Sequence, residues 1–131
     1  MPTLLSLVVY MACLTWVLIV VASVIRVRAW TPSGMLLDFG NRENLPAPSP
    51  LAGRADRTAH NMLENFVLFA ALALVAQAAG ATSPRVILGA EIFCWARLVY
   101  VAVYYAGIPY LRTAVWTVSI AGLGLMVAGM F

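Results

Sequence analysis

One apolar stretch of the sequence opens with a polar run, RADRTAHNMLEN, whose side chains are suited to binding an anion. Arg57, Asn61 and Glu64 stand at positions i, i+4 and i+7 of this run. On a helix these three side chains lie along one stripe, and Arg54 and His60 fall within the same sector of roughly 120°. Ionisable side chains inside an apolar helix are costly, so each of them is a candidate for function.

The next apolar stretch repeats the arrangement, with Arg97, Tyr100 and Tyr104 at positions i, i+3 and i+7, and the last stretch opens with Arg112. If the helices carrying these residues pack side by side, their polar stripes approach one another at the same end. The sequence therefore predicts one polar cavity with several guanidinium groups around a single carboxylate. Such a surplus of cations fits an anionic ligand, since the fork of arginine matches carboxylate geometry.

Each of these residues also has a structural explanation when taken alone. Arg54 and Arg112 could anchor helix ends at the membrane surface, and the two tyrosines could belong to an aromatic belt. Glu64 could neutralise Arg57 or Arg97 as a structural ion pair. Taken together, however, the residues place a single carboxylate among several arginines. A structural ion pair would neutralise only one of these arginines, so binding of an anionic ligand is the favoured hypothesis.

The other reactive residue types do not form a recognisable site. His60 is not part of a serine–histidine–acid or cysteine–histidine arrangement that would make it a catalytic base. A hydrogen-bonded packing role is therefore more common for such a histidine. Glu91 has no role in the pattern beyond pairing with a neighbouring helix or subunit. Cys13 and Cys94 lie in apolar stretches without further ligands at zinc-binding spacing, and we expect no metal site.

The composition is that of an integral membrane protein. Of 131 residues, 63% are hydrophobic and 10% are charged, against roughly 45–50% and about 25% in ordinary globular domains. The charges are too few to cover a soluble surface, and the chain is too apolar to be disordered. The net charge of +3 does not indicate nucleic-acid binding, because the arginines sit in or beside apolar runs.

The expected fold is an all-α, four-transmembrane-helix bundle that runs up and down as a single domain over residues 1–131. Short turns at 80–84 and 107–109 force neighbouring helices to be antiparallel. The polar segment between the first two spans is rich in proline and glycine, so we expect it to be mostly irregular, with an extended run over 46–50. The predicted helices cover approximately 3–28, 56–79, 85–106 and 111–131, and the predicted polar loop covers 29–55.

The distribution of arginine predicts the orientation. The segment between the first two spans and the turn before the last span hold most of the arginines, whereas the remaining turn holds only Arg85. By the positive-inside rule, the arginine-rich side faces the cytoplasm and both termini face the other side. The arginines on the cytoplasmic side are Arg26, Arg28, Arg42, Arg54, Arg57 and Arg112.

Three motifs in this order resemble the membrane-associated proteins in eicosanoid and glutathione metabolism, the family of the microsomal glutathione transferases and leukotriene C synthase. The first is Arg57-x-x-x-Asn61-x-x-Glu64, and the second is the arginine–tyrosine run from Arg97 to Tyr104. The third is the sequence Ile-Pro-Tyr-Leu-Arg that ends at Arg112. The resemblance covers the whole chain in length, helix number and motif order.

The resemblance implies a homotrimer with a glutathione site between neighbouring subunits, near the cytoplasmic face. It implies that Arg57 binds a glutathione carboxylate, that Asn61 and Glu64 hold the γ-glutamyl end, and that Arg112 stabilises the thiolate. The further residues expected to bind glutathione are Tyr100 and Tyr104, which line the pocket, Arg97, which supports it, Arg54, and an arginine at the end of the first span, either Arg26 or Arg28.

The sequence thus predicts a glutathione-dependent transferase or peroxidase of detoxification that acts on lipophilic electrophiles. Glutathione is the expected co-substrate, and no metal is expected. A lysine-free, arginine-rich chain is typical of a GC-rich bacterium, so we expect a multi-pass protein of a bacterial inner membrane. The alternative is a non-catalytic membrane subunit or scaffold with the same fold. A small efflux transporter is disfavoured because the first span lacks an ionisable side chain.

Overall fold

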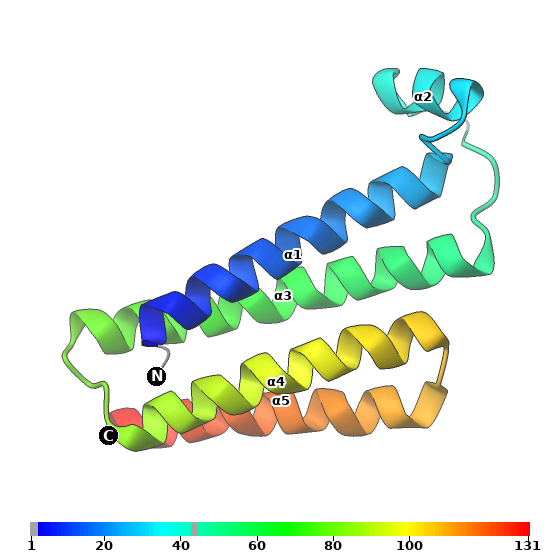
Figure 1. Ribbon diagram of the computed structural model, residues 1–131. Coiled ribbons are helices and arrows are strands. Elements are labelled where there is room, and N and C mark those ends of the chain that lie inside the picture. Colours follow the sequence, from blue (N-terminus) through cyan, green and yellow to red (C-terminus); the bar gives the residue numbers. More distant parts are fainter. Residues whose placement is uncertain (1–2, 43–44) are drawn as a thin grey trace.

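The computed structural model describes residues 3–42 and 45–131, and helices joined by turns and loops make up all of its regular secondary structure over these ranges. Four long helices run alternately up and down, and a short fifth helix lies outside them beyond the end of the first (Figure 1). All four long helices are long and apolar enough to cross a membrane. In chain order the helices are α1 Leu4–Val27, α2 Pro32–Phe39, α3 Pro50–Ala78, α4 Pro84–Ala106 and α5 Pro109–Met130.

Local sequence explains where most of these helices begin. In α1, α2, α3 and α4 a threonine or serine at the N-cap accepts a hydrogen bond from a backbone N–H of the first turn. Proline occupies the first helical position of α2, α3, α4 and α5, where its missing N–H costs nothing. Helix α4 ends at Gly107, whose positive φ of 78° suits a glycine C-cap.

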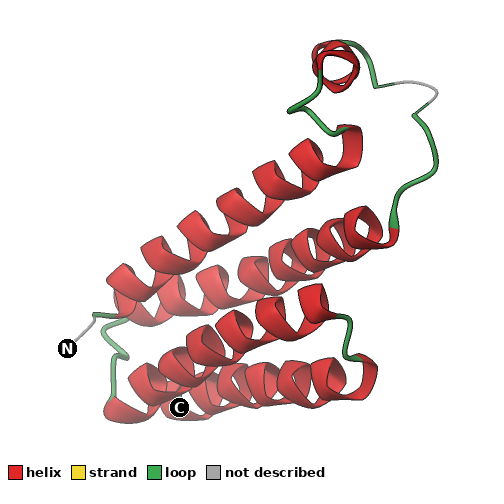
Figure 2. Ribbon diagram, turned by 45° about the vertical axis from the view of Figure 1, so that its right-hand side comes forward, coloured by secondary structure: helices red, strands yellow, loops and turns green. Residues whose placement is uncertain are grey.

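The helices pack as two closely associated pairs, α1 with α3 and α4 with α5, which are visible in Figures 1 and 2. The second pair is tight because two glycines face each other across it. A Cβ on Gly89 would lie 2.6 Å from the carbonyl oxygen of Gly122. The pairs are joined mainly through α3 and α4, where the rings of Phe69 and Phe93 stack with centroids 4.5 Å apart.

The structure confirms the all-α, four-span architecture and corrects the predicted polar loop. Within 29–55, α2 occupies eight residues and α3 begins at Pro50, six residues before the predicted start. Pro32 and Pro50 misled the prediction because each stands at the first position of a helix, directly after a capping Thr31 or Ser49. The described residues 45–49 are non-helical, in agreement with the expected spacer, whereas 43–44 lie outside the described residues.

Candidate functional site

Arg97 is the centre of a polar cluster between α3 and α4. Its side chain is fully buried, and Nη2 donates a hydrogen bond of 2.6 Å to Oδ1 of Asn61. Its guanidinium carbon lies 4.2 Å from the centroid of the Tyr100 ring. The Nε and Nη1 atoms of Arg97 are buried without a hydrogen-bond partner among the described residues. A charged donor inside the protein therefore has unused hydrogen-bonding capacity, which is rare without a functional reason.

Asn61 is fixed by a second amide one helical turn further along α3. The Nδ2 atom of Asn65 donates to the backbone carbonyl of Asn61 at 2.8 Å and to its Oδ1 at 3.2 Å. Asn61 Oδ1 thus accepts two hydrogen bonds, and its own NH₂ group has no partner among the described residues. Only half-buried, Asn61 presents this donor to the cavity that it lines.

Two further arginines approach Tyr104 from different helices. Nε of Arg57 in α3 donates to the hydroxyl oxygen of Tyr104 at 3.0 Å. The guanidinium carbon of Arg112 in α5 lies 4.8 Å from the centroid of the same ring, within cation–π range. The rings of Tyr100 and Tyr104 meet edge to face with centroids 5.5 Å apart. The Tyr104 side chain therefore contacts two guanidinium groups, one from α3 and one from α5.

Asn61, Tyr100, Tyr104 and Arg112 border a cavity of about 220 Å³ at the arginine-rich end of α3, α4 and α5, which we call the arginine–tyrosine pocket; Arg57 and Arg97 do not line it but contact residues that do. No carboxylate is paired with its arginines, because the ion pairs within the described ranges are Arg42–Asp38 and His60–Asp56. The pocket therefore carries an uncompensated positive charge beside aromatic rings. Its lining residues are Asn61, Tyr100, Tyr104, Arg112, Thr113 and Trp116.

Like Arg57, two other predicted residues of α3 do not line this pocket. Arg54 reaches past it, and its Nε donates to the backbone carbonyl of Tyr105 at 3.2 Å. Glu64 is exposed and forms no ion pair with Arg57 or Arg97, so the structural ion pair considered for it is absent from the described structure. Around the helix axis Glu64 lies about 160° from the buried Met62 and about 140° from the buried Phe69. It consequently points out of the bundle.

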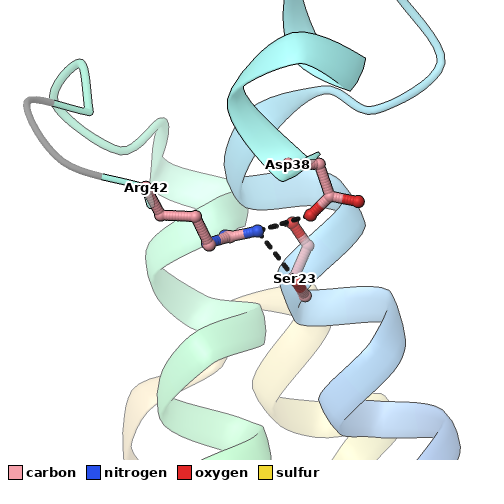
Figure 3. Close-up of polar contacts among 3 residues, drawn as sticks. All are labelled: Ser23, Asp38 and Arg42. Carbon is pink, nitrogen blue, oxygen red and sulfur yellow. Dashed lines mark hydrogen bonds and ion pairs between the residues drawn. The ribbon is translucent and has the colours of Figure 1, made fainter. Parts of the chain in front are cut away.

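Arg26 and His60 belong to a second cavity, of about 280 Å³, between α1, α3 and the segment after α2. Here Arg42 Nη1 donates to Asp38 Oδ1 at 2.6 Å and to the Ser23 hydroxyl at 3.1 Å, as Figure 3 shows. His60 Nδ1 lies 3.0 Å from the backbone carbonyl of its own helix at Asp56. Within one chain the structure separates Arg26 and His60 from the arginine–tyrosine pocket.

The sequence did not indicate Asn65 or Thr113 as part of the site. Asn65 stands four residues after Asn61, so helical spacing could have identified it, but its amide type carries no charge to single it out. Thr113 adjoins Arg112 without any motif of its own. Glu91 lies among apolar residues of α4 and has no hydrogen bond among the described residues. In the same ranges no three potential ligands gather to hold a metal ion.

The fold and the site define a class of protein, a four-span helical membrane protein with a cationic, aromatic pocket at one end. The profile of the MAPEG family matches residues 3–131. The chain therefore belongs to the MAPEG family, the family of microsomal glutathione transferase and leukotriene C4 synthase. No curated protein and no solved structure matches it.

Proposed function

We propose that this protein is a glutathione-dependent membrane transferase or peroxidase, in which the arginine–tyrosine pocket activates the thiol of glutathione for attack on a lipophilic electrophile. The observation that carries the proposal is the unbalanced charge of the pocket. Arg57, Arg97 and Arg112 surround two tyrosine rings, and no carboxylate pairs with any of the three within the described ranges. An anionic ligand would supply the missing charge.

Glutathione fits this set of donors. It has two carboxylates, which suit the guanidinium of Arg57 and the free NH₂ group of Asn61 at the edge of the pocket. The buried Nε and Nη1 of Arg97 add positive potential behind Asn61 and Tyr100. The ammonium of the γ-glutamyl end needs a carboxylate, and Glu64, which is exposed one turn after Asn61, is the carboxylate of α3 on the same side of the helix as Asn61.

The pocket of a single chain is too small for the whole tripeptide. Its 220 Å³ fall below the roughly 300–1,000 Å³ of typical ligand sites, and Glu64 points away from it. Both facts agree with a site completed by a neighbouring subunit, as in the homotrimer that the family resemblance implies. In such an assembly the exposed Glu64, and the Arg26 cavity on the other side of α3, would face the groups of a second copy.

Arg112 is the group we assign to the thiol. A free thiol has a pKa near 8.5, so only a few per cent is thiolate at neutral pH, and a nearby guanidinium stabilises the anion. In conjugation the thiol proton passes to solvent, the sulfur lone pair forms a bond to the electrophilic carbon, and the leaving group departs with the bonding electrons. Tyr104 holds Arg112 in place through the cation–π contact.

The same arrangement explains how the two substrates meet. The arginine-rich ends of the spans would face the cytoplasm of a bacterium, with the protein in the inner membrane, which supplies glutathione from the aqueous side. Trp116 and Thr113 place the other wall of the pocket on α5, whose outer face is apolar. A lipophilic electrophile would therefore arrive laterally from the bilayer.

Glutathione binding to the detergent-purified protein tests the proposal, together with the ultraviolet difference absorbance of the thiolate. We expect saturable binding with a thiolate signal that disappears in Arg112→Ala while binding is largely kept. Arg85→Ala, which removes an exposed arginine at the opposite end of the bundle, is the matched control. A folded protein that binds no glutathione at millimolar concentration would instead indicate a non-catalytic membrane subunit.

A further inference from the structure

The short helix α2 has two faces of different character. On one face Gly34 is buried against the end of α1, where a Cβ would lie 2.0 Å from the carbonyl oxygen of Arg28. On the other face Met35, Leu36 and Phe39 are 46%, 77% and 81% exposed. At about 100° per residue these three side chains span roughly 100° of the helix surface, which forms one continuous apolar strip.

This helix is held in its orientation at both ends. At its start the Thr31 hydroxyl donates to the carbonyl oxygen of Arg28 at 2.8 Å and accepts from the N–H of Gly34 at 3.0 Å. At its end Asp38 accepts a hydrogen bond from Arg42, which also donates to Ser23 of α1 (Figure 3). The apolar strip is thus kept pointing away from α1 and is not free to fold back onto it.

The position of α2 matches a membrane surface. It follows the C-terminal end of the α1 span by five residues and lies outside the four spans in both views (Figures 1 and 2). Trp30, between the two helices, is 63% exposed, and tryptophan is enriched at membrane–water interfaces. Arg28 is exposed and has no ion pair among the described residues, so its charge is available to an anionic headgroup.

We propose that α2 is an interfacial helix, in which Trp30, Met35, Leu36 and Phe39 enter the boundary between lipid headgroups and acyl chains. Lipid is the occupant that the structure favours, because the exposed apolar side chains of α1, including Val20 at 47%, require the same lipid phase beside it. A helix of eight residues is too short to span a bilayer but suits its surface. This inference does not depend on glutathione binding.

Such an anchor has a consequence for the chain that follows it. The segment from Gly40 to Ser49 connects α2 to the first turn of α3, which carries Arg54 and Arg57 a few residues later. Because α2 is attached to the lipid surface and hydrogen-bonded to the end of α1, the start of α3 is held near the membrane boundary. The anchor therefore sets the depth of the polar end of α3.

Spin labels on α2 in phosphatidylglycerol–phosphatidylcholine proteoliposomes test the proposal. Cysteine replaces Leu36 or Phe39 on the apolar strip, or Ser33 on the flank as the matched control, after Cys13→Ala and Cys94→Ala. We expect labels at Leu36 and Phe39 to collide at least severalfold more with oxygen than with a water-soluble nickel chelate, and the label at Ser33 to show the reverse. A strip accessible to nickel overturns the proposal.

A second measurement keeps the native cysteines and separates lipid from a second copy of the chain. Phe39 is replaced by photoreactive p-benzoylphenylalanine, again with Ser33 as the control position, and the proteoliposomes are irradiated. Mass spectrometry should find phospholipid adducts at Phe39 and few at Ser33. Crosslinked dimers in place of lipid adducts, or spin labels shielded from both oxygen and nickel, would show that protein covers the strip and would overturn the proposal.

Discussion

Two polar cavities flank α3, and they differ in whether their arginines are paired with carboxylates. At the arginine–tyrosine pocket, Arg57 and Arg112 approach Tyr104 and have no carboxylate partner in the described structure. In the cavity beside α1, Arg42 is paired with Asp38 at 2.6 Å and also bonded to Ser23. Two cavities of comparable size, about 220 and 280 Å³, therefore differ in how far their charges are already satisfied.

This difference distinguishes arginines that can bind a ligand from arginines that stabilise the fold. A guanidinium that stacks on a ring keeps most of its N–H groups free for an incoming anion, whereas that of Arg42 already donates from both Nη1 and Nη2. The contacts of Arg42 with Asp38 and Ser23, which we call the clasp, join the chain after α2 to α1 and serve the fold. Arg26 is intermediate, because its Nη1 is buried without a partner among the described residues although it lines the same cavity as Arg42. Arg26 therefore has hydrogen-bonding capacity left for a ligand in this cavity.

The largest effect is expected for Arg112→Ala. If Arg112 lowers the pKa of the bound thiol by about two units, its removal reduces the thiolate fraction at neutral pH from the majority to a few per cent. Conjugation with a lipophilic electrophile such as a chloronitrobenzene should fall at least about 20-fold, with a much smaller change in glutathione affinity. Equal losses of rate and affinity would contradict a role on the sulfur, and Arg85→Ala should retain the wild-type rate.

Arg57→Gln should weaken glutathione binding about tenfold, which corresponds to about 1.4 kcal/mol. Glutamine keeps a hydrogen-bond donor near Tyr104 but loses the charge that attracts a carboxylate. Isothermal titration in detergent measures the affinity. Arg42→Gln is the matched change in the other cavity and should leave the affinity unchanged. A similar loss in both variants would mean that the arginines act only through the general positive potential.

Helical periodicity accounts for how much of this arrangement the sequence predicted. Arg97, Tyr100 and Tyr104 had to share one face of α4, and the short turn at 107–108 had to bring Arg112 to the same end. His60 was not predictable in the same way. Its direction differs from that of Asn61 by about 100°, and the choice between facing α1 and facing α4 depends on how α3 is rotated in the bundle. Only packing determines that rotation.

The course of the chain between the first two spans could not be predicted for a different reason. Proline disrupts a helix when it stands in the interior but is favoured at the first helical position. Composition alone does not distinguish these two cases. The fit of Gly34 against the carbonyl of Arg28 and the bond from Arg42 to Ser23, nineteen residues earlier in the chain, depend on how the segment that contains α2 packs on α1. They have no periodic signature, so α2 and the clasp became visible only in the structure.

A smaller effect is expected for Glu64→Gln, which tests whether the site extends beyond one chain. Glu64 is exposed and outside the pocket of its own subunit, so a loss of affinity can arise only from a ligand that reaches past Asn61. We expect glutathione affinity to fall about fivefold, or about 1 kcal/mol, because one exposed charge-assisted contact is weakened. Chemical crosslinking should show a trimer for both proteins, and an unchanged affinity would place the ligand wholly inside the smaller pocket.

The smallest effect is expected for Asp38→Asn, which breaks the charge pair of the clasp without touching the arginine–tyrosine pocket. Because the two side chains are 30% and 33% exposed, the pair is worth at most about 1 kcal/mol. The melting temperature in detergent should fall by no more than about 4 °C, with glutathione affinity unchanged. Limited trypsin digestion should nevertheless cleave faster after Arg42, since its guanidinium keeps the bonds to Ser23 but loses the charge pair that fixes it to α2. Asp56→Asn, which alters only the exposed contact with His60 in the same cavity, should change neither property. Lost glutathione binding in Asp38→Asn would show that the two cavities are coupled and that stabilising the fold and binding a ligand are not separate.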